Sequence, residues 1–212
     1  MTKVKICGIT NADDATVAIS AGADYVGLIF GTSKRQIIKE TAQRILSSTP
    51  NFNNYVGVFL NGKKKQVENI CSTTNIRILQ FHGDETPAFC NYFINRGFEV
   101  IKVFRVKGAE SLVNIEQYDK VSAYFFDSYS AHEHGGTGRT FDWLLLRENN
   151  FLRNRKVFVS GGLDQNNVSE VIKTLHPYAV DASSRLENSV GIKDSEKISD
   201  FIRTVKRCDG NG

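Results

Sequence analysis

The sequence contains no long apolar run and no concentrated block of charge, and each absence excludes a class of protein. No stretch approaches the roughly 20 apolar residues of a membrane span, so the chain is not expected to cross a membrane. The formal net charge of +4 comes from dispersed basic residues. Nucleic-acid binding needs a concentrated basic patch, so no nucleic-acid partner is expected. A small anionic substrate needs only one local positive site and fits this charge.

Cysteine is also scarce, and its spacing excludes two common uses. Cys7, Cys71, Cys90 and Cys208 show no CxxC or zinc-like spacing. They are too few for the disulfide scaffold of a small secreted protein. The chain begins Met-Thr-Lys and passes at once into an apolar run, which leaves no room for a signal peptide. We therefore expect a reducing, cytoplasmic location.

Short β-rich runs alternate with amphipathic segments along the whole chain. Most of the runs are continuously apolar, which is typical of parallel strands buried on both faces. The predicted strands are Val4–Cys7, Tyr25–Phe30, Tyr55–Leu60, Arg77–Phe81, Val100–Arg105, Tyr124–Asp127, Val157–Ser160 and Ala179–Asp181. Helices are predicted to begin near Ala12, Lys39, Lys63, Thr86, Ala109, Phe141, Asn166 and Ser195. Asn11, Asp164 and Asp194 precede three of these helices and are predicted to cap them.

Eight strand–helix units predict an α/β protein with a single closed (β/α)₈ barrel, a TIM barrel, over residues 1–212. An open doubly wound sheet is the alternative. It is disfavoured because no GxGxxG turn follows the first predicted strand. In a barrel, the catalytic groups lie at the carboxyl ends of the strands and in the loops that follow them.

Two reactive side chains end predicted strands. Cys7 ends the first strand and Asp127 ends the sixth. A free cysteine is often a core filler, and Asp127 is equally compatible with a loop or helix cap. Burial at a strand end would raise the pKa of Asp127 towards the range of a working general acid. Both strands end at the same barrel mouth, so the thiol and the carboxyl group can act on opposite sides of one small substrate. The other three cysteines are interpreted as structural.

Glycine- and serine-rich segments follow the last three predicted strands. Barrels often bind phosphate with the loops after strands seven and eight, where backbone N–H groups point at the anion. Glycine permits close approach of the backbone, and serine adds a hydroxyl donor. The predicted substrate-binding residues in these segments are Gly136, Gly138, Gly161, Gly162, Asp181, Ser183 and Ser184.

Four further polar residues are weaker candidates for a functional site. Arg35 follows the second strand, where its guanidinium can fork onto a carboxylate or simply face solvent. His82 ends the fourth strand and is either a site residue or a hydrogen-bonded structural histidine. His132 and His134 lie in the long loop Ser128–Thr140 without an evident third ligand, so no metal is expected.

An ordered set of short motifs runs along nearly the whole chain. The motifs are Lys5–Ile9, Gly27–Phe30, Val56–Phe59, Gln80–Gly83, Asp127 with Gly135–Gly138, Gly161–Leu163 with Asn167–Val168, and Val180–Ser184 with Glu187 and Gly191–Asp194. Together they resemble the phosphoribosylanthranilate isomerase family of tryptophan biosynthesis. The resemblance implies a (β/α)₈ barrel that converts N-(5-phosphoribosyl)anthranilate into 1-(2-carboxyphenylamino)-1-deoxyribulose 5-phosphate, an Amadori rearrangement. It implies no cofactor and no metal, and it leaves both a monomer and a homodimer open.

The resemblance also implies roles for the candidate residues. Asp127 is the general acid that opens the sugar ring, Cys7 is the general base, and Arg35 binds the anthranilate carboxylate. The phosphate lies on the loops after strands seven and eight. Cys7 must act as a thiolate, whereas a free thiol has a pKa of about 8.5. Some local positive charge is therefore expected, and Lys5 on the same strand face is the candidate.

Three residues depart from the family pattern. Lys34 replaces a proline before Arg35, which predicts a more mobile loop, and Ser160 replaces an alanine. Arg185 replaces a glycine. If that glycine has a positive φ, arginine there costs on the order of 1 kcal/mol. We expect the loop to relax instead, with Arg185 near the phosphate or in solvent.

Other functions remain compatible with a phosphate-binding barrel. Indoleglycerol-phosphate synthase needs a lysine acid at a strand end together with glutamates, and a pentose-phosphate epimerase needs metal-binding histidines and aspartates. A barrel without catalytic activity is the third alternative. The presence of Cys7, Asp127 and Arg35 together argues against it.

Overall fold

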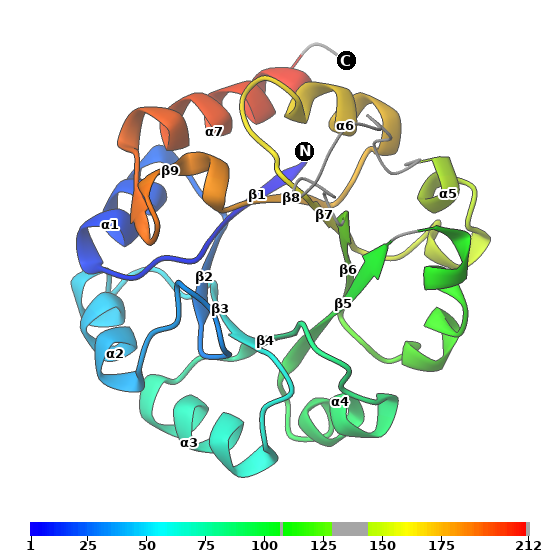
Figure 1. The fold of residues 1–212 in the computed structure, drawn as a ribbon, viewed down its shortest axis with the longest axis horizontal. Helices are drawn as coiled ribbons and strands as arrows, with labels where there is room; N and C mark the ends of the chain where they lie inside the picture. Colours follow the sequence, from blue (N-terminus) through cyan, green and yellow to red (C-terminus); the bar gives the residue numbers. More distant parts are fainter. Residues whose placement is uncertain (107, 129–143, 211–212) are drawn as a thin grey trace.

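Eight parallel strands form a closed barrel surrounded by helices (Figure 1). This computed structural model describes residues 1–106, 108–128 and 144–210. The strands are β1 Lys3–Cys7, β2 Tyr25–Ile29, β3 Tyr55–Phe59, β4 Ile78–Phe81, β5 Glu99–Val106, β6 Ala123–Ser128, β7 Val157–Ser160 and β8 Ala179–Ala182. Every predicted strand is present, and no end is displaced by more than one residue. Pairing of β1 with β8 closes the barrel and excludes the open sheet.

Helices follow the strands on the outside of the barrel (Figure 1). The α-helices are α1 Ala12–Ala21, α2 Lys39–Ser48, α3 Lys64–Thr74, α4 Pro87–Ile94, α5 Leu144–Arg147, α6 Val168–Leu175 and α7 Ser195–Asp209. The 3₁₀ helices are η1 Ala109–Leu112, η2 Ile115–Tyr118, η3 Asn150–Leu152 and η4 Ser184–Leu186, and a hairpin of β9 Glu187–Ser189 and β10 Ile192–Lys193 precedes α7. The helix predicted near Ala109 is therefore 3₁₀ rather than α. The predicted start at Phe141 lies outside the described residues.

Two of the three predicted helix caps are confirmed. The side chain of Asn11 accepts from the Asp14 amide at the start of α1, and Asp194 caps α7 in the same way. The prediction for Asp164 is wrong. Its carboxylate accepts from the amide of Asn166, which closes a local turn, and α6 begins only at Val168.

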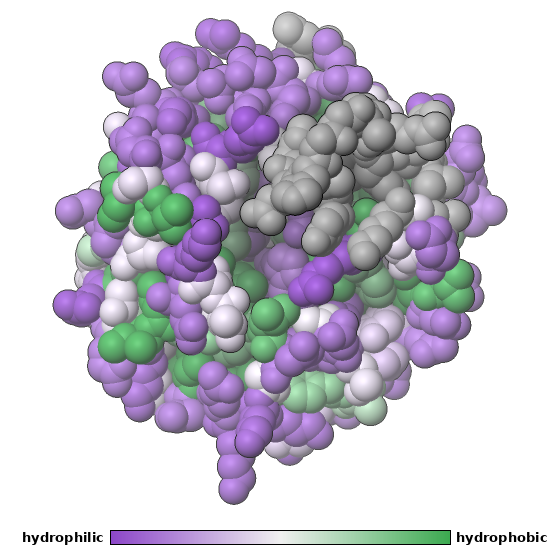
Figure 2. All heavy atoms as spheres, in the orientation of Figure 1, coloured by the Kyte–Doolittle hydropathy of each residue, from purple (hydrophilic) through white to green (hydrophobic). Residues whose placement is uncertain are grey.

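The apolar core has two parts because the strands are buried on both faces. The larger part lies between the strands and the helices. The smaller part fills the barrel interior with residues such as Val58, Ile101, Phe125 and Phe158. The outer surface seen in Figure 2 is mostly hydrophilic, with a recess near the centre of this face. Within the described ranges, no helix is long and apolar enough to cross a membrane.

Candidate active site

A cavity of about 390 Å³ lies at the carboxyl ends of the strands. It is lined by every predicted site residue that the structure describes, namely Cys7, Arg35, His82, Asp127, Gly161, Gly162, Asp181, Ser183 and Ser184. Gly136 and Gly138 lie outside the described residues. The barrel therefore brings together side chains from β1, β4, β6, β8 and the intervening loops.

Lys5, Cys7 and Asp181 form a floor cluster at the base of this cavity. Lys5 and Asp181 are opposite each other in the β1–β8 register, and Lys5 Nζ lies 2.6 Å from Asp181 Oδ1. The Lys5 side chain is fully buried and its ammonium lies 5.5 Å from the centre of the Phe125 ring. Burial raises the pKa of Asp181, although the charge of Lys5 opposes that shift.

The Cys7 thiol is buried beside this ion pair. Burial raises the pKa of Cys7. The charge of Lys5 and its hydrogen bond to the sulfur act in the opposite direction, but their combined effect is smaller than that of burial. The expectation that Lys5 favours the thiolate is therefore correct in direction, but burial outweighs it. The negative charge of Asp181 adds to the rise, because it disfavours the thiolate.

Asp127 of β6 and His82, which directly follows β4, form a rim pair that also lines the cavity. Asp127 Oδ2 lies 3.4 Å from His82 Nε2, and Asp127 Oδ1 accepts a hydrogen bond of 2.7 Å from Ser160 Oγ. Burial acts to raise the pKa of Asp127, but the hydrogen bonds from His82 and Ser160 bring it below its usual value. The prediction of a raised pKa is wrong because these donors stabilise the carboxylate.

Arg35, Glu187 and Lys193 form a clamp cluster at the side of the cavity. Arg35 Nε donates to Glu187 Oε1 over 2.6 Å, and Arg35 Nη2 donates to Glu187 Oε2 over 2.7 Å. Lys193 Nζ lies 3.0 Å from Glu187 Oε1. The predicted fork of Arg35 onto a carboxylate exists, but the partner in this structure belongs to the protein itself. The loop that carries Arg35 is tied to β2 by the Ile37 amide, 2.8 Å from the Ile29 carbonyl.

The loops after β7 and β8 make the remaining wall. Gly161 and Gly162 have φ values of 122° and 64°, a conformation that favours glycine. The Ser183 hydroxyl is buried, and it has no hydrogen-bond partner among the described residues. Arg185 lies in η4, has no positive φ and is exposed at the cavity edge. Arg185 thus has no left-handed backbone and faces solvent at the cavity edge, as expected, whereas the relaxation of the loop stays a prediction.

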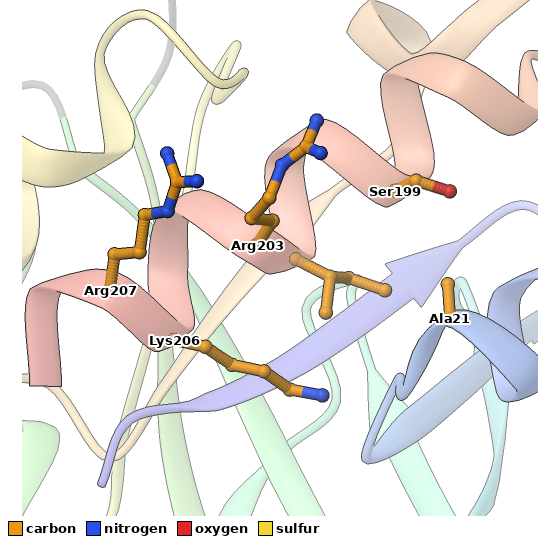
Figure 3. Close-up of a pocket in the computed structure, with 6 residues that line it drawn as sticks. Ala21, Ser199, Arg203, Lys206 and Arg207 are labelled. Carbon is orange, nitrogen blue, oxygen red and sulfur yellow. The ribbon is translucent and has the colours of Figure 1, made fainter. Parts of the chain in front are cut away.

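A second cavity, of about 420 Å³, lies between α1 and α7 (Figure 3). It contains none of the predicted site residues. Its lining includes the exposed cations Arg203, Lys206 and Arg207, and Arg203 is paired with Asp200. Within the part of the chain that the structure describes, no group of three or more potential ligands is placed to hold a metal ion. His132 and His134 lie outside that part.

The family model described as N-(5'-phosphoribosyl)anthranilate (PRA) isomerase matches residues 4–204. This chain belongs to the phosphoribosylanthranilate isomerase family. It is 43% identical over 211 residues to the N-(5'-phosphoribosyl)anthranilate isomerase of Citrifermentans bemidjiense, covering 98% of each chain. The crystal structure of the isomerase from Thermotoga maritima has a TM-score of 0.88 at 37% identity and covers 98% of this chain and 100% of its own.

A further isomerase structure was solved in complex with reduced 1-(o-carboxyphenylamino)-1-deoxyribulose 5-phosphate. It has a TM-score of 0.85 at 35% identity and covers 98% of this chain and 100% of its own.

Sequence reasoning missed three residues that shape this isomerase-family site. Ser160 contacts Asp127 directly, and Glu187 holds Arg35. Gly27 is the third, because a Cβ there would lie 2.6 Å from Cys7 Sγ and 3.1 Å from Lys5 Nζ. A glycine inside an apolar strand signals such a close approach. For Glu187 the only signal was membership of a motif, and for Ser160 it was the departure from the alanine of the family pattern.

Proposed function

We propose that this barrel is a phosphoribosylanthranilate isomerase that works by general acid–base catalysis, with Asp127 as acid and Cys7 as base. The observation that carries the proposal is that both side chains line one cavity from different strands, β6 and β1. The related structure with a reduced carboxyphenylamino-deoxyribulose phosphate supports a phosphosugar ligand for the same cavity.

The reaction needs one proton delivered and one removed. Asp127 donates its proton to the furanose ring oxygen of N-(5-phosphoribosyl)anthranilate, and the C1′–O bond breaks to give a protonated Schiff base. Cys7 as thiolate then removes the proton from C2′ and leaves an enolamine. Tautomerisation gives the ketone 1-(2-carboxyphenylamino)-1-deoxyribulose 5-phosphate of tryptophan biosynthesis. Since oxidation of C2′ balances reduction of C1′, the step needs no cofactor.

The shifted pKa values of Cys7 and Asp127 favour the protonation states opposite to those that this mechanism requires. The raised pKa of Cys7 favours the thiol, and the lowered pKa of Asp127 favours the carboxylate. Catalysis needs the thiolate together with the carboxylic acid. Both arrangements hold one proton, so transfer from Cys7 to Asp127 creates the active form without a change in net charge. Between the two pKa values the active fraction is therefore independent of pH.

The other cavity residues account for the two anionic ends of the substrate. Arg35 is proposed to bind the anthranilate carboxylate. Gly161, Gly162, Ser183 and Ser184 are proposed to bind the phosphate, together with Gly136 and Gly138. His82 and Asp181 are proposed to contact the sugar between them. The buried Ser183 hydroxyl supports this assignment: it has no partner among the residues that the structure describes, and a buried donor is costly unless a ligand uses it.

We further propose that residues 1–212 act as one domain in the cytoplasm, without a nucleic-acid partner. A monomer and a homodimer both remain compatible with the fold. One similar structure, at 34% identity with a TM-score of 0.84, is of monomers generated from the dimeric isomerase of Thermotoga maritima.

A fluorescence assay on freshly prepared phosphoribosylanthranilate tests the function and the mechanism separately. Wild type is expected to be active, and Cys7→Ser and Asp127→Asn are each expected to lose about 10²- to 10⁴-fold in kcat. Cys208→Ser, at a thiol in α7 that does not line the cavity, is the matched control. Full activity in both site variants would contradict the mechanism, and an inactive wild type would contradict the function.

A further inference from the structure

Glu187 is buried beside Arg35 and is not among the residues that line the cavity. Its side chain is only 5% exposed, and it lies at the start of the β9–β10 hairpin. Arg35 does line the cavity. Arg35 therefore contacts both the Glu187 carboxylate and the cavity.

The guanidinium retains donors after Glu187 has bound. Arginine carries five N–H groups in a planar fork. Glu187 occupies the edge made by Nε and Nη2. The remaining edge, made by Nη1 and the second N–H of Nη2, has the geometry that binds another carboxylate through two parallel hydrogen bonds. Because Glu187 occupies the first edge, the remaining edge is the one whose donors are left for a ligand in the cavity that Arg35 lines.

Lys193 holds Glu187 in place. Lys193 Nζ lies 3.0 Å from Glu187 Oε1 and donates to the Ser183 carbonyl over 3.1 Å. The Lys193 amide is bound by the carboxylate of Asp14 at 2.8 Å. The clamp cluster contains two cations and one anion, so its own charges leave a positive excess. It is also joined to the loop after β8 through Ser183.

We infer that Glu187 is a positioning residue that fixes the guanidinium of Arg35 so that its remaining edge binds the carboxylate of the substrate. The inference rests on the proposed function. Glu187 does not touch the substrate; it acts through Arg35. Lys193 keeps Glu187 oriented and supplies the charge that compensates it. Since a free arginine side chain must be ordered before it can bind, prior fixation lowers the entropic cost of binding the carboxylate.

Two reduced product analogues separate this role from a general structural one. The first is reduced 1-(2-carboxyphenylamino)-1-deoxyribulose 5-phosphate, and the second is the same compound without the carboxylate. Their affinities are measured by calorimetry, which does not depend on turnover. In wild type the carboxylated analogue is expected to bind more tightly. In Glu187→Gln the affinity for the carboxylated analogue should fall roughly 10- to 100-fold, as expected for the loss of a charge-assisted hydrogen bond. The affinity for the analogue without the carboxylate should not change.

Combination with Arg35→Met tests whether Glu187 acts through Arg35. In the Arg35→Met background, Glu187→Gln should produce no further loss of preference for the carboxylated analogue. Glu187→Asp keeps the charge and shortens the side chain, so it should lose an intermediate amount. Glu116→Gln, at an exposed residue of η2, is the control and should match wild type.

Two results would overturn the inference. One is an equal loss of affinity for both analogues in Glu187→Gln, which is the result of a structural role alone. The other is an unchanged preference in both Glu187→Gln and Glu187→Asp; if the glutamine variant does not fold, the aspartate variant decides. A wild type that binds the carboxylated analogue but does not turn over phosphoribosylanthranilate would instead contradict the proposed function.

Discussion

Asp181 in the floor cluster and Asp127 in the rim pair both line the cavity, and each has a basic side chain beside it. The Asp181 side chain is 9% exposed and that of Asp127 is 32% exposed. Burial raises the pKa of Asp181 in spite of Lys5. The hydrogen bonds from His82 and Ser160 lower the pKa of Asp127 in spite of its partial burial. The same type of side chain is thus perturbed in opposite directions within one cavity.

The difference shows which physical effect controls the pKa values in each of the two clusters. On the floor, the loss of hydration on burial outweighs the nearby charge for Cys7 as well as for Asp181, and it raises both pKa values. At the rim, hydrogen bonds to the charged form of Asp127 prevail. The proposed base and acid therefore start from opposite protonation states to those that catalysis needs. Changes on the floor should affect stability most, whereas changes at the rim should affect the pH dependence.

Removal of Lys5, the cation of the floor cluster, should have the largest effect on stability. In Lys5→Met the Asp181 carboxylate loses its buried partner, which typically costs about 3–5 kcal/mol in the free energy of unfolding. The control is Lys3→Met, since the Lys3 side chain is 44% exposed in its ion pair with Asp24. That pair should contribute less than about 1 kcal/mol. Denaturant unfolding measures both, and equal losses would remove the distinction between floor and surface.

The Lys5→Met variant also tests the influence of Lys5 on the thiol. The positive charge of Lys5 lowers the pKa of Cys7, so its removal should raise that pKa. Above the pKa of Cys7 the single proton shared by the thiol and the Asp127 carboxylate is lost, so the rate falls. The basic limb of the kcat/KM profile should therefore move to higher pH. An unmoved profile would exclude Lys5 from any role in tuning Cys7.

A methyl group beside the Cys7 thiol should have an intermediate effect on stability and should also lower kcat. The Cβ introduced by Gly27→Ala lies 2.6 Å from Cys7 Sγ, so the thiol must move. Overpacking of this kind costs about 1–3 kcal/mol, and kcat should fall because the base is displaced. Gly62→Ala is the matched control, because its nearest neighbour is 3.5 Å away and its φ is not positive. An active, fully stable Gly27→Ala protein would show that the floor is less rigidly packed than its contacts imply.

Loss of the hydrogen bond from Ser160 to Asp127 at the rim should have the smallest effect, a shift in the pH dependence of kcat/KM. Ser160→Ala removes a donor that stabilises the Asp127 carboxylate, so the pKa of Asp127 should rise. The acidic limb of kcat/KM reports that pKa and should move to higher pH, while the rate between the limbs does not fall. Ser199→Ala, at an exposed residue of α7, is the control. A loss of activity at all pH values, with no movement of the limb, would assign Ser160 a different role.

Much of this architecture was accessible from the sequence for a definite reason. Parallel strands buried on both faces are continuously apolar, so they stand out even in single-sequence patterns. Asp164 shows the limit of local reasoning. An aspartate before a helix pattern suits both a cap and a preceding turn, and the choice depends on the starting point of α6.

By itself the sequence determined the eight strands, the strand-end positions of Cys7 and Asp127 and, through its ordered motifs, the family. Only the tertiary structure decided which polar groups meet. Arg35 and Glu187 are 152 residues apart, and Lys5 and Asp181 are 176 apart. Contacts at such separations depend on barrel closure, which no local pattern contains. The directions of the pKa shifts follow from those contacts and from burial, so they too depend on the folded chain.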